Sequence, residues 1–184
     1  KKLESDNTYG VGLGEEYKNI RFGLYAAEPL TAADGTEIPQ DGLLEIVGID
    51  ENGLAVFTAD VPAGAKLYVK EVATDAHYLL SDAIYPVAFD YEDVSVAFVQ
   101  LVINNGEVIE NTIIRGSIHG LKVDEDNTPV AGAVFGLFKA NETEFTEKNA
   151  LATATLGEDG VFTFENIPYG DWIVRELSCP AHLV

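Results

Sequence analysis

The sequence has few of the residues that crosslink chains, bind zinc or contact nucleic acid. Its single cysteine cannot form an internal disulfide, and its three histidines have no zinc-like spacing to cysteine. Only 11 Lys and Arg stand against 31 Asp and Glu, and a formal charge of −20 would repel phosphate backbones and anionic membrane surfaces. No apolar run approaches the roughly 18 residues of a membrane span. We therefore expect no metal, no cofactor, no nucleic acid partner and no membrane insertion in this segment.

The residues that are present predict a folded, all-β protein. Hydrophobic residues make up 47% of the chain, which is enough for packed cores. Helical periodicity is nearly absent, and short alternating runs such as LAVFTADV, KLYVKEV, VAFVQLVI and DWIVREL are separated by Gly, Pro, Asn and Asp. Residues 144–152 are the one expected short helix or loop insert. No signal peptide opens the chain at KKLESD, and we interpret the sequence as a piece of a longer protein.

An internal repeat divides the chain into two copies of one domain. FGLYAA (22–27) aligns with FGLFKA (135–140), and KEVATDAHYL aligns with RELSCPAHLV, with the matching points in the same order. The second copy begins in GSIHGLKVD, so the expected domains are 1–115 and 116–184. No Ser/Pro-rich linker lies between them, which predicts two β-sandwiches directly in tandem.

Each copy directs one acidic side chain toward apolar neighbours. In LYVKEV, alternation places Glu71 on the face of Leu67 and Val69. In WIVREL, Glu176 shares the face of Trp172 and Val174 in the same way. An exposed edge strand would also tolerate these acids, but alternation predicts that both carboxylates point inward at matching positions.

The order of motifs in the second copy resembles one family of surface domains. A lysine-bearing strand (GLKVDED) is followed by PVAGAVFGLF and then by GEDGVFTFENIPYGDWIVRELSCPAH. This order resembles the B-type domain of collagen adhesins, the CnaB or SpaA-like domain. These are prealbumin-like β-sandwiches of Gram-positive pilins and wall-anchored adhesins. The resemblance implies an isopeptide bond between a Lys on the first strand and an Asn on the last, promoted by a buried acid.

The resemblance implies the following residues for the first copy. Glu71 is the promoting acid, and Asn111 is the acceptor because it shares an apolar face with its neighbouring isoleucines. Lys2 is the preferred nucleophile, since KLESD aligns with KVDED. Lys1 is its direct competitor, and Lys18 is a weaker third candidate.

The second copy carries only part of the same set. Lys122 and Glu176 are present, but no acceptor strand follows, and Asn166 is interpreted as a turn residue. We therefore expect the second sandwich to lack its last strand and its acceptor Asn. A longer parent chain or a neighbouring molecule would supply the strand, or proteolysis has removed it. An exposed strand edge there would favour pairing with another strand.

The expected function is that of a structural stalk or adhesin module of a bacterial cell-surface or pilin-like protein, located outside the cell. Its expected partners are further domains of the same surface protein. The alternative is a binding domain that recognises a host matrix protein or glycan through exposed aromatic residues: Tyr9, Tyr17, Tyr85 and Tyr91. No nucleophile motif of an enzyme is present, and the acidic run DEDN (124–127) is a solvated turn without the Gly and closing Glu of an EF-hand. The chain is therefore not expected to be an enzyme, apart from forming its own bond.

Overall fold

The computed structural model describes residues 1–88 and 103–180, and nearly all of its regular structure is β-strand. The chain divides into two compact units. Unit 1 contains Lys1–Ser5 and Gly12–Thr112, and unit 2 contains Asp6–Val11 and Ile113–Val184. The predicted all-β class is confirmed. The predicted strand VAFVQLVI and Tyr91 lie outside the described residues, apart from Ile103.

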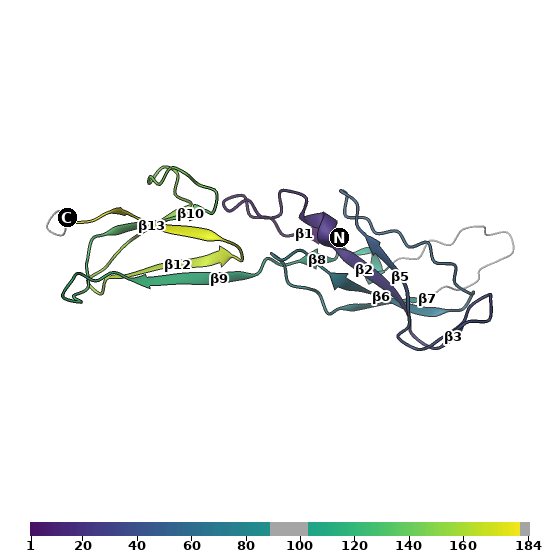
Figure 1. The fold of residues 1–184 in the computed structure, drawn as a ribbon. Helices are drawn as coiled ribbons and strands as arrows, with labels where there is room; N and C mark the ends of the chain where they lie inside the picture. Colours follow the sequence, from purple (N-terminus) through teal and green to yellow (C-terminus); the bar gives the residue numbers. More distant parts are fainter. Residues whose placement is uncertain (89–102, 181–184) are drawn as a thin grey trace. The chain divides into compact units, whose positions relative to one another are not determined.

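Unit 1 is organised around a four-stranded antiparallel sheet in the order β5-β2-β6-β7 (Figure 1). Its strands are β2 (Arg21–Ala26), β5 (Leu43–Gly48), β6 (Lys66–Ala73) and β7 (Ile84–Ala88). One face of β2 and β6 forms the core with Phe22, Leu24, Leu67 and Val69. Alternation along these strands is the cause, because every second side chain points to the same face.

The described part of unit 1 also contains four short strands and two short helices. β1 (Lys2–Leu3) pairs in parallel with β8 (Glu110–Asn111), and β3 (Leu30–Thr31) pairs with β4 (Glu37–Ile38). The 3-10 helices are η1 (Glu16–Asn19) and η2 (Asn104–Gly106). The predicted strand LAVFTADV is not assigned as a strand, because residues 54–60 have no ladder partner among the described residues.

Unit 2 consists of a three-stranded sheet, β11-β10-β13, and a two-stranded sheet, β12-β9 (Figure 1). The strands are β9 (Arg115–Leu121), β10 (Val134–Lys139), β11 (Ala152–Thr155), β12 (Val161–Pro168) and β13 (Trp172–Ser178). Side chains between the sheets form its core, with Leu137 and Phe164 both buried. Residues 144–151 form a loop with no helix, and Ala152 already begins β11. Phe145 of this loop packs edge-on against Phe138.

The two units repeat the same strand register, as the internal repeat predicts. In unit 1 the central strand places Phe22 opposite Glu71, and in unit 2 it places Phe135 opposite Glu176. In both pairs a register shift lies directly beside this position. The repeat therefore extends from sequence to the positions of the two acids.

The division between the units falls near, but not at, the expected boundary of 115/116. Ile113 is buried, and the backbone N–H of Tyr169 donates to the carbonyl oxygen of Ile114. Ile113 and Ile114 are therefore counted with unit 2. Asp6–Val11 also belongs to unit 2, although it precedes most of unit 1. Asp6 forms a 2.8 Å ion pair with Arg115, and Tyr9 packs edge-on to Trp172. The sequence similarity between the two copies could not predict that Asp6–Val11 packs with unit 2.

Phe138→Ala should destabilise unit 2 strongly, because Phe138 is fully buried and its removal leaves a cavity. The expected loss is about 3–5 kcal/mol of unfolding free energy. Trp172 is the only tryptophan, so urea unfolding followed by its fluorescence reports on unit 2. The control Leu121→Ala removes a side chain that is 60% exposed. It should change stability by less than about 0.5 kcal/mol, and an equal effect of the two substitutions would contradict this packing.

Candidate functional site

The site in unit 1 is built on β6, which directs Glu71 into the core. Leu67, Val69 and Glu71 are all buried on one face of the strand, as alternation predicts. Glu71 Oε2 accepts a 3.0 Å hydrogen bond from the backbone N–H of Ser81. One carboxylate oxygen is thus held by the backbone, and the other is directed at the remaining members of the site.

Asn111 lies on β8, and its amide faces Glu71. Asn111 Nδ2 donates to Glu71 Oε1 over 2.7 Å and to Thr74 Oγ1 over 2.8 Å. The residue is only 2% exposed. The amide therefore has a fixed orientation, with its nitrogen against the carboxylate and its carbonyl oxygen on the other side.

Lys1 completes the site by donating from Nζ to Asn111 Oδ1 at 2.5 Å. Its Nζ also lies 3.6 Å from Glu71 Oε1, and the two side chains are 1% and 0% exposed. Burial lowers the pKa of the Lys1 ammonium, although the negative charge and hydrogen bonding of Glu71 act in the opposite direction. A lysine in this environment is closer to its neutral, nucleophilic form than an exposed one.

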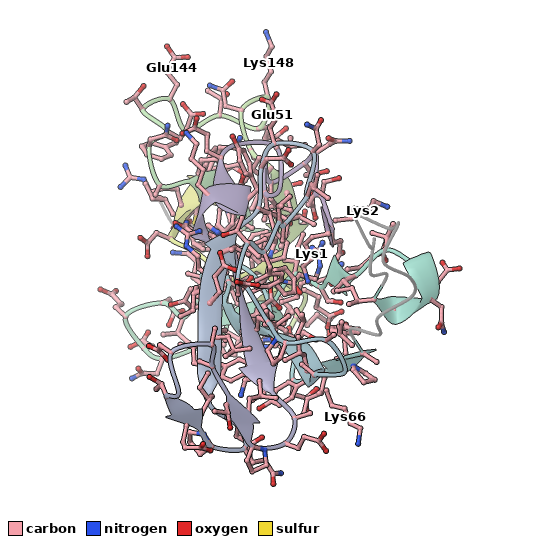
Figure 2. All side chains as sticks on the ribbon, turned by 90° about the vertical axis from the view of Figure 1, so that its right-hand side faces the viewer. Lys1, Lys2, Glu51, Lys66, Glu144 and Lys148 are labelled. Carbon is pink, nitrogen blue, oxygen red and sulfur yellow. The ribbon has the colours of Figure 1, made fainter. Side chains whose placement is uncertain are left out.

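The preference for Lys2 over Lys1 is corrected by this geometry. The side chain of Lys2 is 68% exposed and pairs with Glu110 at 3.3 Å, and Figure 2 shows it extending away from the ribbon. A shift of one residue in a strand moves a side chain to the opposite face, so the alignment of KLESD with KVDED was one position out of register. Lys18 is also excluded, because it lies on the exposed η1 and pairs with Glu15.

The arrangement can transfer a proton between two nitrogens. Glu71 Oε1 lies between Lys1 Nζ and Asn111 Nδ2, at 3.6 Å and 2.7 Å. Lys1 donates to the carbonyl oxygen of Asn111, whereas Glu71 accepts from the amide nitrogen. Among the described residues, no buried side-chain nitrogen or oxygen lacks a hydrogen-bond partner. The three side chains therefore satisfy one another.

Unit 2 carries the equivalent lysine and acid, but its described residues place no asparagine in contact with this pair. Lys122 Nζ lies 3.1 Å from Glu176 Oε2, and these side chains are 25% and 32% exposed. In the described part of unit 2, neither side chain is hydrogen bonded to an asparagine. Asn166 is a turn-like residue with φ of 59° at the register shift of β12, in agreement with its interpretation. Its backbone oxygen accepts from Arg115 instead.

Tyr78 anchors the chain that follows β1. Its hydroxyl donates to the backbone oxygen of Glu4 over 2.9 Å, and the residue is 2% exposed. Sequence reasoning did not identify Tyr78, because nothing in the motif marks it. Its burial raises the pKa of the phenol to about 12. The neutral hydroxyl therefore helps to hold the segment from which Lys1 enters the site.

The other candidate features do not assemble into sites. Two of the tyrosines expected to contact a ligand belong to different units: Tyr9 packs on Trp172 in unit 2, whereas Tyr85 packs against the core of unit 1. Asp124 Oδ1 accepts from the backbone N–H groups of Asp126 and Thr128, which makes DEDN a turn. The described residues contain no group of three metal ligands. Among them, no helix has the length and apolarity needed to span a bilayer.

Comparison with known proteins supports the predicted resemblance. Residues 116–184 match the family described as SpaA, prealbumin-like fold domain. The resemblance to SpaA-like domains that the sequence predicts is therefore confirmed. No curated protein sequence matches the chain.

Two solved structures share the fold over nearly the whole chain. The Bacillus anthracis TIE protein is 18% identical with a TM-score of 0.58, covering 97% of this chain and 28% of that protein. A C-terminal fragment of the pilus adhesin SpaC from Lactobacillus rhamnosus GG is 15% identical with a TM-score of 0.51, covering 97% of this chain and 74% of the fragment. The chain thus spans less than a third of the first protein, and at these identities the likeness shows the fold.

Tyr78→Phe should lower stability at neutral pH by about 0.5–1.5 kcal/mol, through loss of one hydrogen bond. The wild-type contribution should be complete below the ordinary phenol pKa of about 10 and should be lost as the pH rises toward the folded pKa of about 12. Thermal unfolding between pH 9 and pH 12 should therefore show a shallower decline for Tyr78→Phe. The exposed Tyr169 provides the control Tyr169→Phe, which should keep the wild-type slope. Identical slopes for wild type and Tyr78→Phe would refute this role.

Proposed function

We propose that this chain is a structural module of a bacterial surface or pilin-like protein, stabilised by an isopeptide bond between Lys1 and Asn111 that Glu71 promotes. The observation that carries the proposal is the buried contact of all three side chains, with Lys1 Nζ at the Asn111 amide and Glu71 against both. The SpaA-type fold and the pilus adhesin among the similar structures support the module's setting at the outer cell surface.

The reaction needs no cofactor and balances within the site. Neutral Lys1 Nζ attacks Asn111 Cγ and forms the new C–N bond, and the Cγ–Nδ2 bond breaks. The proton lost by the attacking nitrogen passes to Glu71 and from there to the departing Nδ2, which leaves as ammonia. The 2.7 Å hydrogen bond between Glu71 and the departing nitrogen supports this route.

Burial and proximity both promote the proposed reaction of Lys1 with Asn111. A charged lysine is disfavoured in the core, and burial lowers the pKa of Lys1 accordingly. Folding also converts a reaction between distant residues into one between neighbours, which gives a high effective concentration. The polar environment is fixed before the reaction, because Thr74 and Ser81 hold the amide and the carboxylate.

The bond would suit a chain that carries mechanical load. It would join Lys1, directly before β1, to Asn111 of β8, and a tensile force entering there would pass through the bond without unfolding the residues between. By analogy with a disulfide that closes about 100 residues, the entropic stabilisation is on the order of 4–5 kcal/mol. An amide is not opened by reducing agents, so a protein with one cysteine gains a permanent crosslink.

In unit 2 we propose the same chemistry for Lys122 with Glu176 as promoter, once an asparagine is brought beside them. The 3.1 Å pair supports this assignment, and its partial exposure agrees with a site that lacks one member. Neighbouring domains of the same surface protein, or other subunits of a pilus, are the proposed partners. In the part of the chain that the structure describes, no cluster of exposed tyrosines supports the alternative of a host matrix protein or glycan.

The intact mass of variants tests the Lys1–Asn111 bond directly. Wild-type protein should weigh less than its sequence by one ammonia, because each isopeptide bond releases one. Lys1→Ala, Glu71→Ala and Asn111→Ala should each keep the full mass expected from their sequences. Their thermal and protease resistance should fall, since the crosslink no longer restrains the unfolded chain.

Lys2→Ala is the matched control, because it removes the neighbouring but exposed lysine. It should retain the loss of one ammonia and the wild-type resistance. A wild-type protein of full mass would refute the proposal, and a bond that persists in Lys1→Ala but disappears in Lys2→Ala would return the nucleophile to Lys2.

A further inference from the structure

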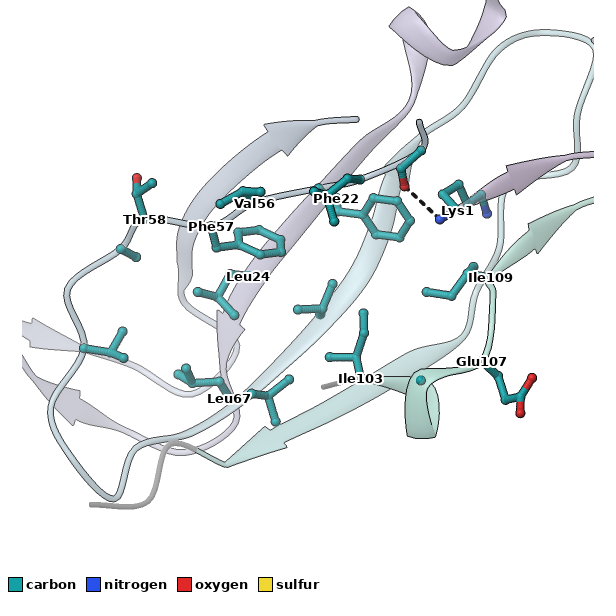
Figure 3. Close-up of a pocket in the computed structure, with 18 of the residues that line it drawn as sticks. Lys1, Phe22, Leu24, Val56, Phe57, Thr58, Leu67, Ile103, Glu107 and Ile109 are labelled. Atoms are coloured by element: carbon teal, nitrogen blue, oxygen red, sulfur yellow. Dashed lines mark hydrogen bonds between the residues drawn. The ribbon is translucent and has the colours of Figure 1, made fainter. Parts of the chain in front are cut away.

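The outer face of the unit 1 sheet is the side of β5, β2, β6 and β7 that is turned away from the core. On the inner face, Phe22, Leu24 and Leu67 line the pocket shown in Figure 3. Alternation places the intervening residues on the outer face, where an antiparallel sheet usually carries polar side chains. Three outward residues are instead apolar and are 49%, 51% and 60% exposed: Leu43, Ile46 and Ile84. An apolar face of this kind is typical of a surface that another segment covers.

The outer face also differs in charge from the rest of the chain. The chain has 31 acidic and 11 basic residues, yet the only acids in these four strands, Glu45 and Glu71, lie on the inner side. The outward residues of β6 include two lysines, Lys66 and Lys70. Lys66 pairs with Glu28 at 3.1 Å. In the described part of the chain, no carboxylate forms an ion pair with Lys70.

Tyr25 lies at the centre of the outer face, and its ring has a fixed position. The ring is stacked on that of Tyr68 with centroids 5.1 Å apart, and Lys70 Nζ lies 4.7 Å from its centre. It also lies across Gly23, because a Cβ added there would be 2.6 Å from a carbon of the ring. Tyr68 in turn donates a 3.0 Å hydrogen bond to Asp41. Both tyrosines are only half-buried, so the rings are held in place but are still accessible.

Unit 2 has the same arrangement on its own outer face. The internal repeat places Phe138 at the position of Tyr25. The ring of Phe138 lies across Gly136 in the same way, because a Cβ added there would be 2.7 Å from a carbon of this ring. The register places Arg175 opposite Gly136, as it places Lys70 opposite the corresponding glycine of unit 1.

In unit 2 an acidic loop, residues 140–151, covers this face. Phe145 of the loop packs edge-on against Phe138, with ring centroids 5.1 Å apart. Phe138 is therefore fully buried, whereas Tyr25 is not. Arg175 lies 4.7 Å from the centre of the Phe145 ring. The aromatic ring is surrounded in the sequence by three acids: Glu142, Glu144 and Glu147.

The corresponding connection of unit 1, residues 27–42, does not cover the outer face in this way. It contains no aromatic residue, so it has no counterpart of Phe145. It forms β3 and β4 instead, and its Leu30 and Ile38 pack into the core on the inner side. The outer face of unit 1 therefore has the aromatic centre and the cation of unit 2 without the ring that covers them.

We propose that the outer face of the unit 1 sheet is a docking surface for an acidic loop of a partner protein that carries one aromatic side chain. The aromatic ring packs edge-on against Tyr25, as Phe145 packs against Phe138. A carboxylate close to it in the sequence pairs with Lys70, which complements the charge of the face. The exposed Ile46 contributes apolar area to the contact.

A peptide with the sequence of residues 141–149 is the probe for this surface. It is titrated against the full chain, labelled with ¹⁵N, in about 0.15 M salt, which screens the charge of −20. The backbone amide signals of Gly23, Tyr25 and Lys70 should shift and saturate. The signal of Gly136 should stay unchanged, because its face is already covered. The same peptide with Phe145→Ala should bind about tenfold more weakly or less, because it lacks the ring.

Two charge reversals test the part played by Lys70. Lys70→Glu should weaken binding of the peptide by about tenfold, because it replaces an attraction with a repulsion. Lys148→Glu is the matched control, since it makes the same change of net charge at an exposed side chain of unit 2 and should leave binding unchanged. Lys70→Gln should have an intermediate effect, and the amide spectrum of each variant reports that it is folded.

Four results would overturn the proposal. They are unchanged signals of the outer face at millimolar peptide, equal binding of the Phe145→Ala peptide, equal effects of Lys70→Glu and Lys148→Glu, and shifts of the same signals on raising the concentration of the chain alone. The last result would assign the face to a second copy of the chain. None of these outcomes depends on the Lys1–Asn111 bond, whose presence the mass measurement reports separately.

Discussion

The buried contact of Lys1, Glu71 and Asn111 is the interaction on which unit 1 depends. β1 and β8 are each two residues long and pair only through Lys2↔Glu110 and Leu3↔Asn111. Such a short ladder contributes little stability by itself. Glu71 projects from the main sheet and receives the amide of Asn111, so the polar contact links the terminal strands to β6. The first and last strands of the unit are thus held in place by side chains more than by their own backbone pairing.

The same contact explains why an acidic protein keeps a lysine in its core. A charge of −20 at the surface favours protonated lysines, but Lys1 is almost fully removed from solvent. Burying an ion pair costs much of the attraction that it gains, so the arrangement is costly while the three groups remain separate. Conversion of the lysine and the asparagine into one amide would remove the positive charge from the core. The buried arrangement therefore favours the proposed reaction, which would make the contact permanent.

The parts of the fold and site that follow from local alternation could be predicted from the sequence. The inward faces of Glu71 and Asn111 and the turn at Asn166 are set by neighbours one or two residues away. The choice between Lys1 and Lys2 depends on the register of β1 against β8, which no local pattern specifies. The same limit applies to residues 54–61, since strand pairing needs a partner that alternation does not reveal. The inclusion of Asp6–Val11 in unit 2 rests on long-range contacts, such as Asp6 with Arg115.

The central claim is a covalent link between two particular side chains, and peptide mapping by tandem mass spectrometry tests it most directly. Protease digestion of the wild-type chain should release one branched peptide in which the Nζ of Lys1 is joined to the Cγ of Asn111. No unmodified peptide containing Asn111 should remain. Recovery of Lys1 and Asn111 only in separate, unmodified peptides would contradict the account.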